Sequence, residues 1–228
     1  WKNALKHIET KSFYIITAIA VIISTLSLIN YTNGDLFESI RIGAFHYISA
    51  MTGTGYQITP SFTVLPSFFF GLLIIGMILG AGVGSTCGGI KQYRVGLGIK
   101  SLYWSFSDKI AHKNVIKKHF INKLGNKMIV DQDDISDNYS FILVYLIFLM
   151  IGTLIFSIVS NSSMQNSLFE FASVLGTVGL SVGITGYDAH PIILWTSSIG
   201  MFLGRLEFYV FFIAISKIII DSKRGFKN

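Results

Sequence analysis

Two long runs without a charged residue constrain most strongly what this chain can fold into. Residues Ser12–Asn30 contain no charge over 19 positions, and Tyr139–Ser160 contain none over 22. A helix needs about 20 apolar residues to cross the hydrocarbon core of a bilayer. Two further apolar regions cover residues 62–90 and 191–220, and only 13% of the chain is charged. The sequence therefore predicts an all-α integral membrane protein.

The distribution of basic residues predicts the orientation of these helices. Nine Lys and Arg residues fall within residues 91–127, and others precede the first run and end the chain. Cytoplasmic loops carry an excess of such residues, so we expect both ends and the central segment in the cytoplasm of a multi-pass protein of the cell membrane. Basic residues beside a span favour anionic membrane lipid as a partner, and we expect no nucleic-acid binding.

An internal repeat relates the two halves of the chain. Residues 45–59 align with residues 169–183 at an offset of 124 positions, with Phe45/Phe169, Ser49/Ser173 and Gly55/Gly179 identical. Each stretch follows a long apolar run and precedes another. Residues 36–51 are too few to span a bilayer, so each short helix must turn back within it. His46 and Glu170 occupy matching positions on these short helices and are candidates to buttress the turn at the end of each one.

The Gly- and Thr-containing turns after the short helices are candidate selectivity filters. Non-helical backbone at membrane depth survives where protein buries it or where it lines water. Glycine permits positive φ, which lets successive carbonyl oxygens face one axis and replace the hydration shell of a cation. The alternative is an ordinary surface turn or close helix packing. The candidate filter residues are Thr52, Gly53, Thr54, Gly55 and Tyr56, and Gly176, Thr177, Val178, Gly179 and Leu180.

The repeat predicts the domain organisation as two tandem span–pore helix–filter–span units of a pseudo-fourfold pore. The first unit covers residues 1–99, with spans at 12–30 and 62–99, a pore helix at 37–51 and a filter at 52–57. A cytoplasmic amphipathic linker covers 100–138. The second unit covers 139–228, with spans at 139–160 and 190–220, a pore helix at 166–175 and a filter at 176–181.

A glycine-rich break interrupts the second apolar region of the first unit. The stretch GAGVGSTCGG, residues 80–89, has five glycines, and each interior glycine costs a helix about 0.5–1 kcal/mol relative to alanine. We therefore expect an unwound segment. It does not match a phosphate loop because Ile90 stands where lysine is required. The alternative interpretation is close helix packing through small residues.

Arg205 is the one basic residue deep inside a predicted span, and the repeat offset places it level with the break. An arginine at mid-membrane costs about 2.5–3.5 kcal/mol on insertion scales, so it needs a partner. Glu207 points elsewhere on a helix, whereas the freed carbonyls of the break suit a guanidinium. The alternative is a structural pair with a carboxylate of a missing half of the protein. The candidate gate residues are Gly80, Gly82, Gly84, Ser85, Thr86, Gly88, Gly89 and Arg205.

Three runs stand beside these two units: LGTVGLSVGITG (175–186), GSTCGGIK (84–91) and GRLE (204–207). Together with the units, they resemble the Trk/Ktr/HKT superfamily of potassium transporters, especially TrkH/KtrB-like membrane subunits. Those subunits have four such units around one pore, and this chain resembles the last two. The resemblance implies K⁺ as the transported ion, held by the carbonyls of Thr54, Gly55, Val178 and Gly179, with no organic cofactor. It also implies a loop gate below the filter.

The same resemblance implies partners and leaves alternatives open. The partners are a missing N-terminal half with two further pore units, a second copy of the full-length subunit, and a cytosolic nucleotide-binding regulatory subunit. A sodium or poorly selective monovalent cation transporter is an alternative, because in the plant branch a serine of the first filter accompanies sodium selectivity. A non-conducting regulatory half-protein is another. An intramembrane enzyme is not expected, because no nucleophile or metal set assembles.

Overall fold

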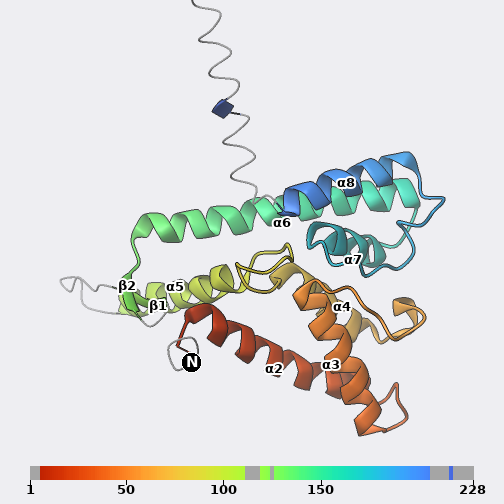
Figure 1. Cartoon of the computed structure of the whole chain (residues 1–228), viewed down its shortest axis with the longest axis horizontal. Helices are drawn as coiled ribbons and strands as arrows, with labels where there is room; N and C mark the ends of the chain where they lie inside the picture. Colours follow the sequence, from red (N-terminus) through yellow and green to blue (C-terminus); the bar gives the residue numbers. More distant parts are fainter. Residues whose placement is uncertain (1–5, 111–118, 124–125, 206–215, 218–228) are drawn as a thin grey trace, which may run out of the picture.

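The computed structural model describes residues 6–110, 119–123, 126–205 and 216–217, and this part of the chain is mostly helical (Figure 1). The elements in chain order are α2 (Ile8–Leu28), α3 (Leu36–Thr52), η1 (Phe62–Val64), α4 (Ser67–Leu79), α5 (Gln92–Ile110), β1 (Phe120–Lys123), β2 (Asn126–Ile129), α6 (Gln132–Ser160), α7 (Met164–Leu175) and α8 (Pro191–Arg205). Among the described helices, α2 and α6 are long and apolar enough to cross a membrane, and α4 is a shorter apolar helix.

The helices form two groups of the same order, each with a long helix, a short helix and a third helix. Helix α3 packs against α2 and α4, and α7 packs against α6 and α8 (Figure 1). Contacts between α4 and α7 join the groups. At this junction the rings of Phe70 and Phe169 stack with centroids 4.4 Å apart, and Phe62 lies 5.1 Å from Phe169. The repeat seen in the sequence therefore corresponds to a repeated arrangement of helices.

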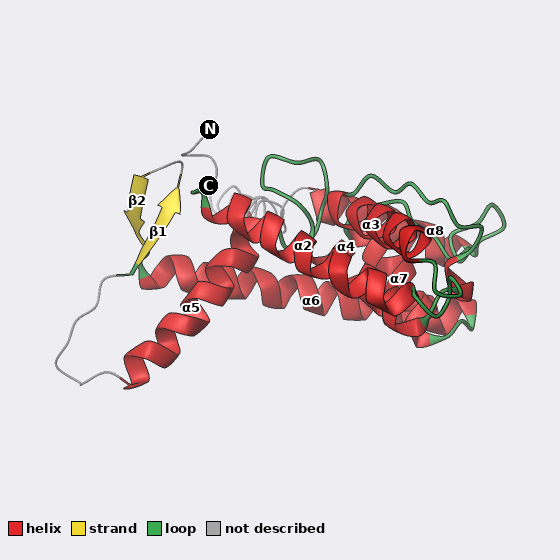
Figure 2. Cartoon of the chain, turned by 90° about the horizontal axis from the view of Figure 1, so that it is seen from below, coloured by secondary structure: helices red, strands yellow, loops and turns green. Residues whose placement is uncertain are grey.

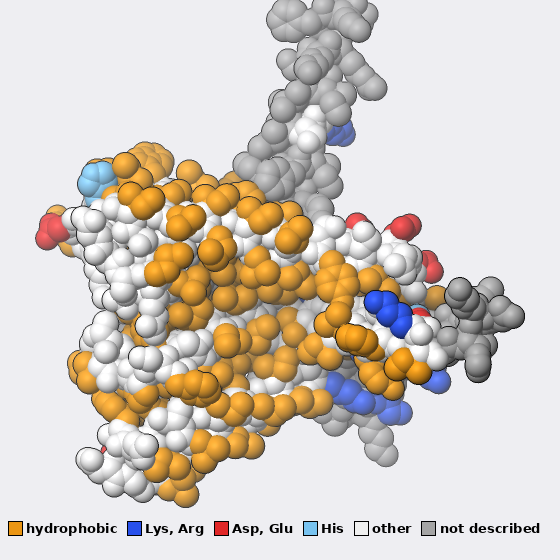
Figure 3. Space-filling model, turned by 180° about the vertical axis from the view of Figure 1, so that it is seen from behind, with side chains coloured by type: hydrophobic (Ala, Val, Ile, Leu, Met, Phe, Trp, Pro, Cys, Tyr) orange, Lys and Arg blue, Asp and Glu red, His pale blue; other side chains and the backbone are white. Residues whose placement is uncertain are grey.

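The outer surface of the helices exposes many large apolar side chains, which is unfavourable in contact with water. Ile22 on α2, Ile158 on α6 and Trp195 on α8 are 61%, 73% and 72% exposed. Figure 3 shows hydrophobic side chains across the middle of one face, with Lys and Arg side chains toward one end. Apolar patches of this extent mark surfaces that contact lipid or other protein.

The segment after α4 differs from a continuous second span. Helix α4 ends at Leu79, and α5 begins at Gln92, so residues 80–91 separate two helices where the sequence predicts one span over 62–99. The break itself is where the glycines predict it. Helix α5 then continues to Ile110, beyond the expected start of the linker at residue 100.

Residues 120–123 and 126–129, within the predicted amphipathic linker, form strands. This part forms the antiparallel hairpin β1–β2, in which Phe120 pairs with Ile129 at one end of the molecule (Figure 2). Ile121 is buried in a small cluster with Ile8, Leu97 and Val130. The side chain of Ile121 packs into that cluster. A strand suits this contact because its alternation turns the neighbouring side chains outward. Residues 111–118 lie outside the described part of the chain.

Helix α6 begins seven residues before the expected span. Asp131 and Asp134 form a capping box, in which each carboxylate accepts a hydrogen bond from the backbone N–H of the other residue. Acidic side chains in the first turn also complement the helix dipole. The run DQDDISD therefore starts the helix instead of ending the linker.

Candidate ion pathway

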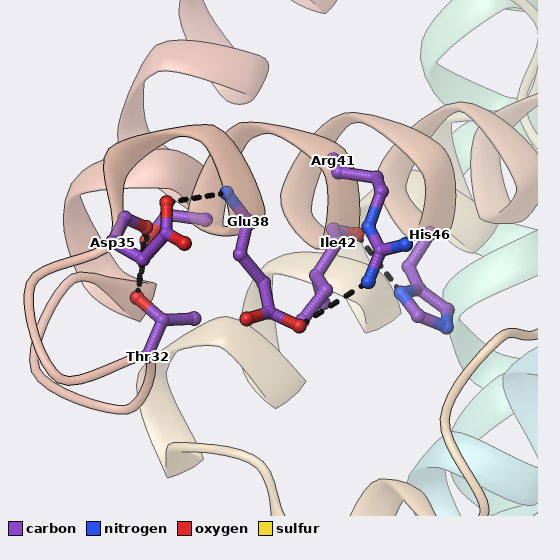
Figure 4. A network of polar contacts seen from close by, with 7 residues as sticks. Thr32, Asp35, Glu38, Arg41, Ile42 and His46 are labelled. Carbon is purple, nitrogen blue, oxygen red and sulfur yellow. Dashed lines mark hydrogen bonds and ion pairs between the residues drawn. The ribbon is translucent and has the colours of Figure 1, made fainter.

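Helix α3 brings the first candidate filter into place. Its N-terminus is capped by Asp35, whose Oδ1 accepts from the Glu38 N–H at 3.1 Å (Figure 4). It ends at Gly53, which has a left-handed conformation with φ of 69°. Beyond it the chain turns back on the helix, because Thr54 N donates to Ser49 O at 3.1 Å and Ser49 Oγ donates to Tyr56 O at 2.7 Å.

Helix α7 places the second candidate filter in the same manner. Ser163 caps its N-terminus by accepting from Asn166 N, and Gly176 follows its last residue. Val178 N donates to Ser173 O at 2.9 Å, and Gly179 N donates to Ser173 Oγ at 3.1 Å. Ser173 and Val178 stand at the repeat positions of Ser49 and Thr54, so the two turns share a backbone hydrogen bond as well as a sequence pattern.

The two turns lie against each other. Gly55 has φ of 75°, and a Cβ at this position would collide with the carbonyl oxygen of Val178. Only glycine fits there, both for its backbone angles and for the space available. Gly179 has φ of 96°, but among the described residues nothing lies within 4 Å of the Cβ position. Thr177 also has positive φ, at 51°, and its buried hydroxyl has no partner in the described part of the chain.

His46 and Glu170 hold the backbone that comes after each turn. His46 is buried, its Nδ1 donates to Ile42 O at 2.9 Å (Figure 4), and its Nε2 accepts from Ile58 N at 3.2 Å. Nδ1 therefore carries the ring proton. Glu170 is 1% exposed, and Oε2 accepts from Val182 N at 2.7 Å. Ile58 and Val182 are repeat equivalents, so two different side chains perform the same contact.

Glu170 makes further contacts that His46 cannot make. Its Oε1 accepts from Ser181 Oγ at 2.7 Å, from Thr185 N at 3.1 Å and from the Thr185 hydroxyl. Every one of these groups donates, and the carboxylate oxygens accept. Glu170 therefore binds Ser181, Val182 and Thr185 of the segment after the second turn.

The glycine-rich segment between α4 and α5 is a closed loop with a hydrogen-bonded base. Ile90 N donates to Ile78 O at 2.9 Å, and Lys91 N donates to Leu79 O at 3.0 Å. Gln92 Nε2 donates to Gly80 O at 2.8 Å, while its Oε1 accepts from Ser12 of α2. The loop is therefore tethered at both of its ends.

The loop lies against the ends of both short helices. Gly88 N donates to Gly176 O at 2.8 Å. A Cβ on Gly53 would lie 2.6 Å from the Cβ of Cys87. Since Gly53 and Gly176 belong to the two candidate filters, the loop contacts both of them. The C-terminal end of a helix carries about half a negative charge, so the space at the ends of the two short helices favours a cation.

Arg205 reaches this loop, as the repeat offset predicts. Its Nη1 donates to the backbone carbonyl of Thr86. The neighbouring Gly204 packs on α7, and a Cβ there would collide with Leu175 O. Glu207, the other partner considered, lies outside the described residues.

The remaining candidate gate residues belong to the same loop. Ser85 Oγ donates to Gly82 O at 2.5 Å, and Gly80 and Gly89 pack on each other at the base. Among the described residues, nothing lies within 4 Å of a Cβ built on Gly84.

Two further side chains at the loop were not predicted from the sequence. Lys91 is buried, and its Nζ donates to Cys87 O at 2.7 Å. Glu9, at the start of α2, accepts from Val83 N at 2.5 Å. Nothing local in the sequence marks Glu9, because it lies 74 positions from the group that it binds.

An apolar helical frame around paired helix–turn elements is the architecture of a helical membrane transporter. The crystal structure of the potassium transporter TrkH from Vibrio parahaemolyticus has the same fold, with a TM-score of 0.76 and 22% identity over 92% of this chain. The TrkH family of cation transport proteins matches residues 4–223. The chain belongs to that family.

Curated relatives agree with the family. An uncharacterized cation transporter of Methanocaldococcus jannaschii is 30% identical over 209 residues, 88% of this chain and 39% of the relative. The Trk system potassium uptake protein TrkG of Escherichia coli is 27% identical over 221 residues, 94% of this chain and 44% of the relative. The chain thus spans about two fifths of the length of the relatives it matches.

Proposed function

We propose that this chain forms part of a pore for potassium uptake across the cell membrane. Relatives named as potassium uptake proteins, TrkG of Escherichia coli and the Ktr system protein B of Vibrio alginolyticus, support K⁺ as the transported ion. The carbonyl oxygens of Thr54, Gly55, Val178 and Gly179 are the proposed K⁺ ligands. Carbonyl rings replace the hydration shell of a cation without adding charge.

The chemistry of the proposed pathway is electrostatic. Both short helices direct their C-terminal ends to the turns, and their dipoles stabilise a cation there. His46 and Glu170 hold the backbone after the turns, so the carbonyls are positioned before the ion arrives. This preorganisation limits the cost of ordering the turns on ion binding.

The loop over residues 80–89 is the proposed gate. The observation that carries this proposal is the hydrogen bond from Arg205 to Thr86 O, formed across 119 positions of sequence. It holds the loop beneath both turns, and the guanidinium charge opposes a cation leaving them. Opening then requires the loop to swing aside.

A complete pore needs more than this chain. Two turns supply two sides of a four-sided ring, so we propose two further pore units in the full-length subunit, as expected for relatives more than twice as long. A second copy of that subunit and a cytosolic nucleotide-binding regulatory subunit are further proposed partners. Conduction of sodium, or no conduction at all, are the alternatives that a transport measurement distinguishes.

The test is transport by the full-length protein in cells that lack potassium uptake. The parent protein should restore growth at low K⁺. Arg205→Ala should raise K⁺ flux severalfold without a change in K⁺/Na⁺ preference, because the turns are untouched. The K⁺ flux of Arg205→Lys should lie between that of the parent protein and that of Arg205→Ala, since lysine retains the charge but not the planar fork of donors.

Three results contradict the proposal. Na⁺ flux without K⁺ flux, and hence without growth rescue at low K⁺, identifies a sodium transporter. A complete absence of flux in assembled parent protein identifies a non-conducting subunit. Loss of flux in assembled Arg205→Ala protein makes the arginine a structural support or an essential pore group instead of a latch.

A further inference from the structure

A carboxylate binds the glycine-rich loop at a backbone group other than the one that Arg205 binds. Glu9 lies in the first turn of α2, and its Oε1 accepts a hydrogen bond from Val83 N at 2.5 Å. The Glu9 side chain is 19% exposed. A Cβ on the adjacent Gly82 would collide with the same carboxylate oxygen, so glycine at 82 is what lets the carboxylate approach the backbone.

Glu9 binds the short turn of residues 82–85 through a backbone N–H, and Arg205 binds the residue after that turn through a backbone carbonyl. Ser85 N donates to Gly82 O at 2.9 Å and closes that turn. On one flank the N–H of Val83 donates to Glu9; on the other the carbonyl of Thr86 accepts from Arg205. The first contact comes from α2 and the second from α8, so each of the two repeated units contributes one charged side chain.

The surroundings of Glu9 make its contact breakable. Glu9 and Val83 line a cavity of about 780 Å³, together with Arg94, Lys123 and Asp137. Water in such an opening competes for the Val83 N–H, so the contact can open and reclose at modest cost. Charge still makes it stronger than a neutral hydrogen bond.

We propose that Glu9 is a second latch of the gate, a positioning residue that keeps the loop in the closed position from α2. This inference rests on the proposed function, in which the loop is the gate. A displacement of α2 by one hydrogen-bond length breaks the Glu9 contact while the Arg205 contact remains. The gate therefore senses the positions of two helices, one from each unit.

The buried thiol of Cys87 provides a measurement independent of transport. Cys87 is 3% exposed and lies in the loop, where its Sγ accepts from Ala81 N at 3.1 Å. It reacts with N-ethylmaleimide only when the loop opens. The experiment labels the full-length protein in membranes and quantifies the alkylated Cys87 peptide by mass spectrometry, so cysteines elsewhere do not interfere.

Removal of the latch should speed this labelling. Glu9→Ala should raise the rate about threefold to 30-fold, as expected for loss of one partly exposed, charge-assisted hydrogen bond. The labelling rate of Glu9→Gln should lie between that of the parent protein and that of Glu9→Ala, because the amide oxygen of glutamine still accepts a hydrogen bond. Asp137→Asn removes the same charge from the same cavity without touching Val83 and should label at the parental rate.

A second pair of variants tests the contact without removing the charge. Gly82→Ala pushes the carboxylate away, whereas Gly84→Ala adds the same methyl group where, among the described residues, nothing lies within 4 Å. Gly82→Ala should therefore label faster than Gly84→Ala. Equal rates for this pair, with parental labelling of Glu9→Ala, would overturn the latch.

Transport measured on the same variants distinguishes the two proposals. Faster labelling with raised K⁺ flux supports both the latch and the gate. Faster labelling with unchanged flux retains the latch and removes the gate function of the loop. Parental labelling of assembled Glu9→Ala, with Arg205→Ala still raising flux, retains the gate and rejects Glu9 as its latch.

Discussion

At the scale of single residues, the two filter glycines carry different constraints. Both have positive φ, which disfavours any residue with a Cβ. Gly55 is also packed against the carbonyl of Val178, whereas no described residue lies within 4 Å of the Cβ position of Gly179. Equivalent positions in the repeat therefore tolerate substitution differently.

Gly179→Ser should leave the protein assembled but reduce its preference for K⁺ over Na⁺. Strain of about 1–3 kcal/mol at a non-glycine residue in this conformation turns the neighbouring carbonyls away from the ion axis. Growth rescue at low K⁺, measured with and without added Na⁺, gives the preference.

Gly55→Ser supplies the comparison for this experiment. The collision with Val178 O adds to the same backbone strain, so the yield of assembled protein should fall as well as its selectivity. Parental selectivity in both variants would remove both glycines from the filter.

At the scale of elements, the short helices α3 and α7 pack in the same way within their groups but differ in the side chain that supports the turn after each one. His46 offers one acceptor to the backbone after α3, and Glu170 offers two oxygens to the backbone and hydroxyl groups after α7. The second turn therefore depends more strongly on a single residue than the first.

Glu170→Gln should destabilise the second turn. One carboxylate oxygen becomes an NH₂ group that faces only donors, which leaves buried groups unpaired at a cost of about 2–3 kcal/mol. The melting temperature in detergent should fall, and K⁺/Na⁺ discrimination should weaken in the protein that remains folded.

Glu38→Gln on α3 is the matched control. The same change there removes an exposed pair with Arg41, worth at most about 1 kcal/mol (Figure 4). If Glu170→Gln has the same melting temperature as Glu38→Gln and keeps its K⁺/Na⁺ selectivity, the Glu170 carboxylate contributes little to the second turn.

At the scale of the whole molecule, an apolar surface runs along the helices and basic residues concentrate in the segment between the two groups. Lys113, Lys117 and Lys118 of that segment lie outside the described residues. Their charge still makes them candidates to bind anionic lipid or the proposed regulatory subunit.

Neutralising Lys113, Lys117 and Lys118 together should weaken the response of transport to anionic lipid or to the proposed regulatory subunit, while basal flux persists. Each basic residue near an anionic surface contributes about 1 kcal/mol. Flux of purified protein in liposomes, with varied anionic lipid and with or without the regulator and its nucleotide, measures both responses.

The same number of charges removed at the chain end, by neutralising Lys223, Arg224 and Lys227, controls for net charge. Equal lipid and nucleotide responses in the two triple variants would leave the central segment as a topological signal alone.

Much of this protein could be predicted from its sequence because the relevant signals are local. Uncharged runs report burial in an apolar medium, and the repeat is visible as matching residues at one offset. Clustered glycines destabilise a helix, so a break was predictable at residues 80–89, within the interval 80–91 that separates α4 from α5. The contact of Arg205 with the break could be expected from the same offset, because a repeat in sequence places equivalent residues at equivalent depth.

Other features depend on how the helices pack, and local patterns do not contain them. The hairpin β1–β2 forms where Ile121 can join the cluster of Ile8 and Leu97, which α2 and α5 bring together. The contact of Gly55 with Val178 and that of Glu9 with Val83 join residues far apart in the chain. Such pairs leave no periodicity in either segment. Sequence alone therefore determined the class and the repeat, and the ion pathway that it predicts stays a prediction. Tertiary structure decided which side chains support the turns and the loop, because only packing sets distances between distant segments.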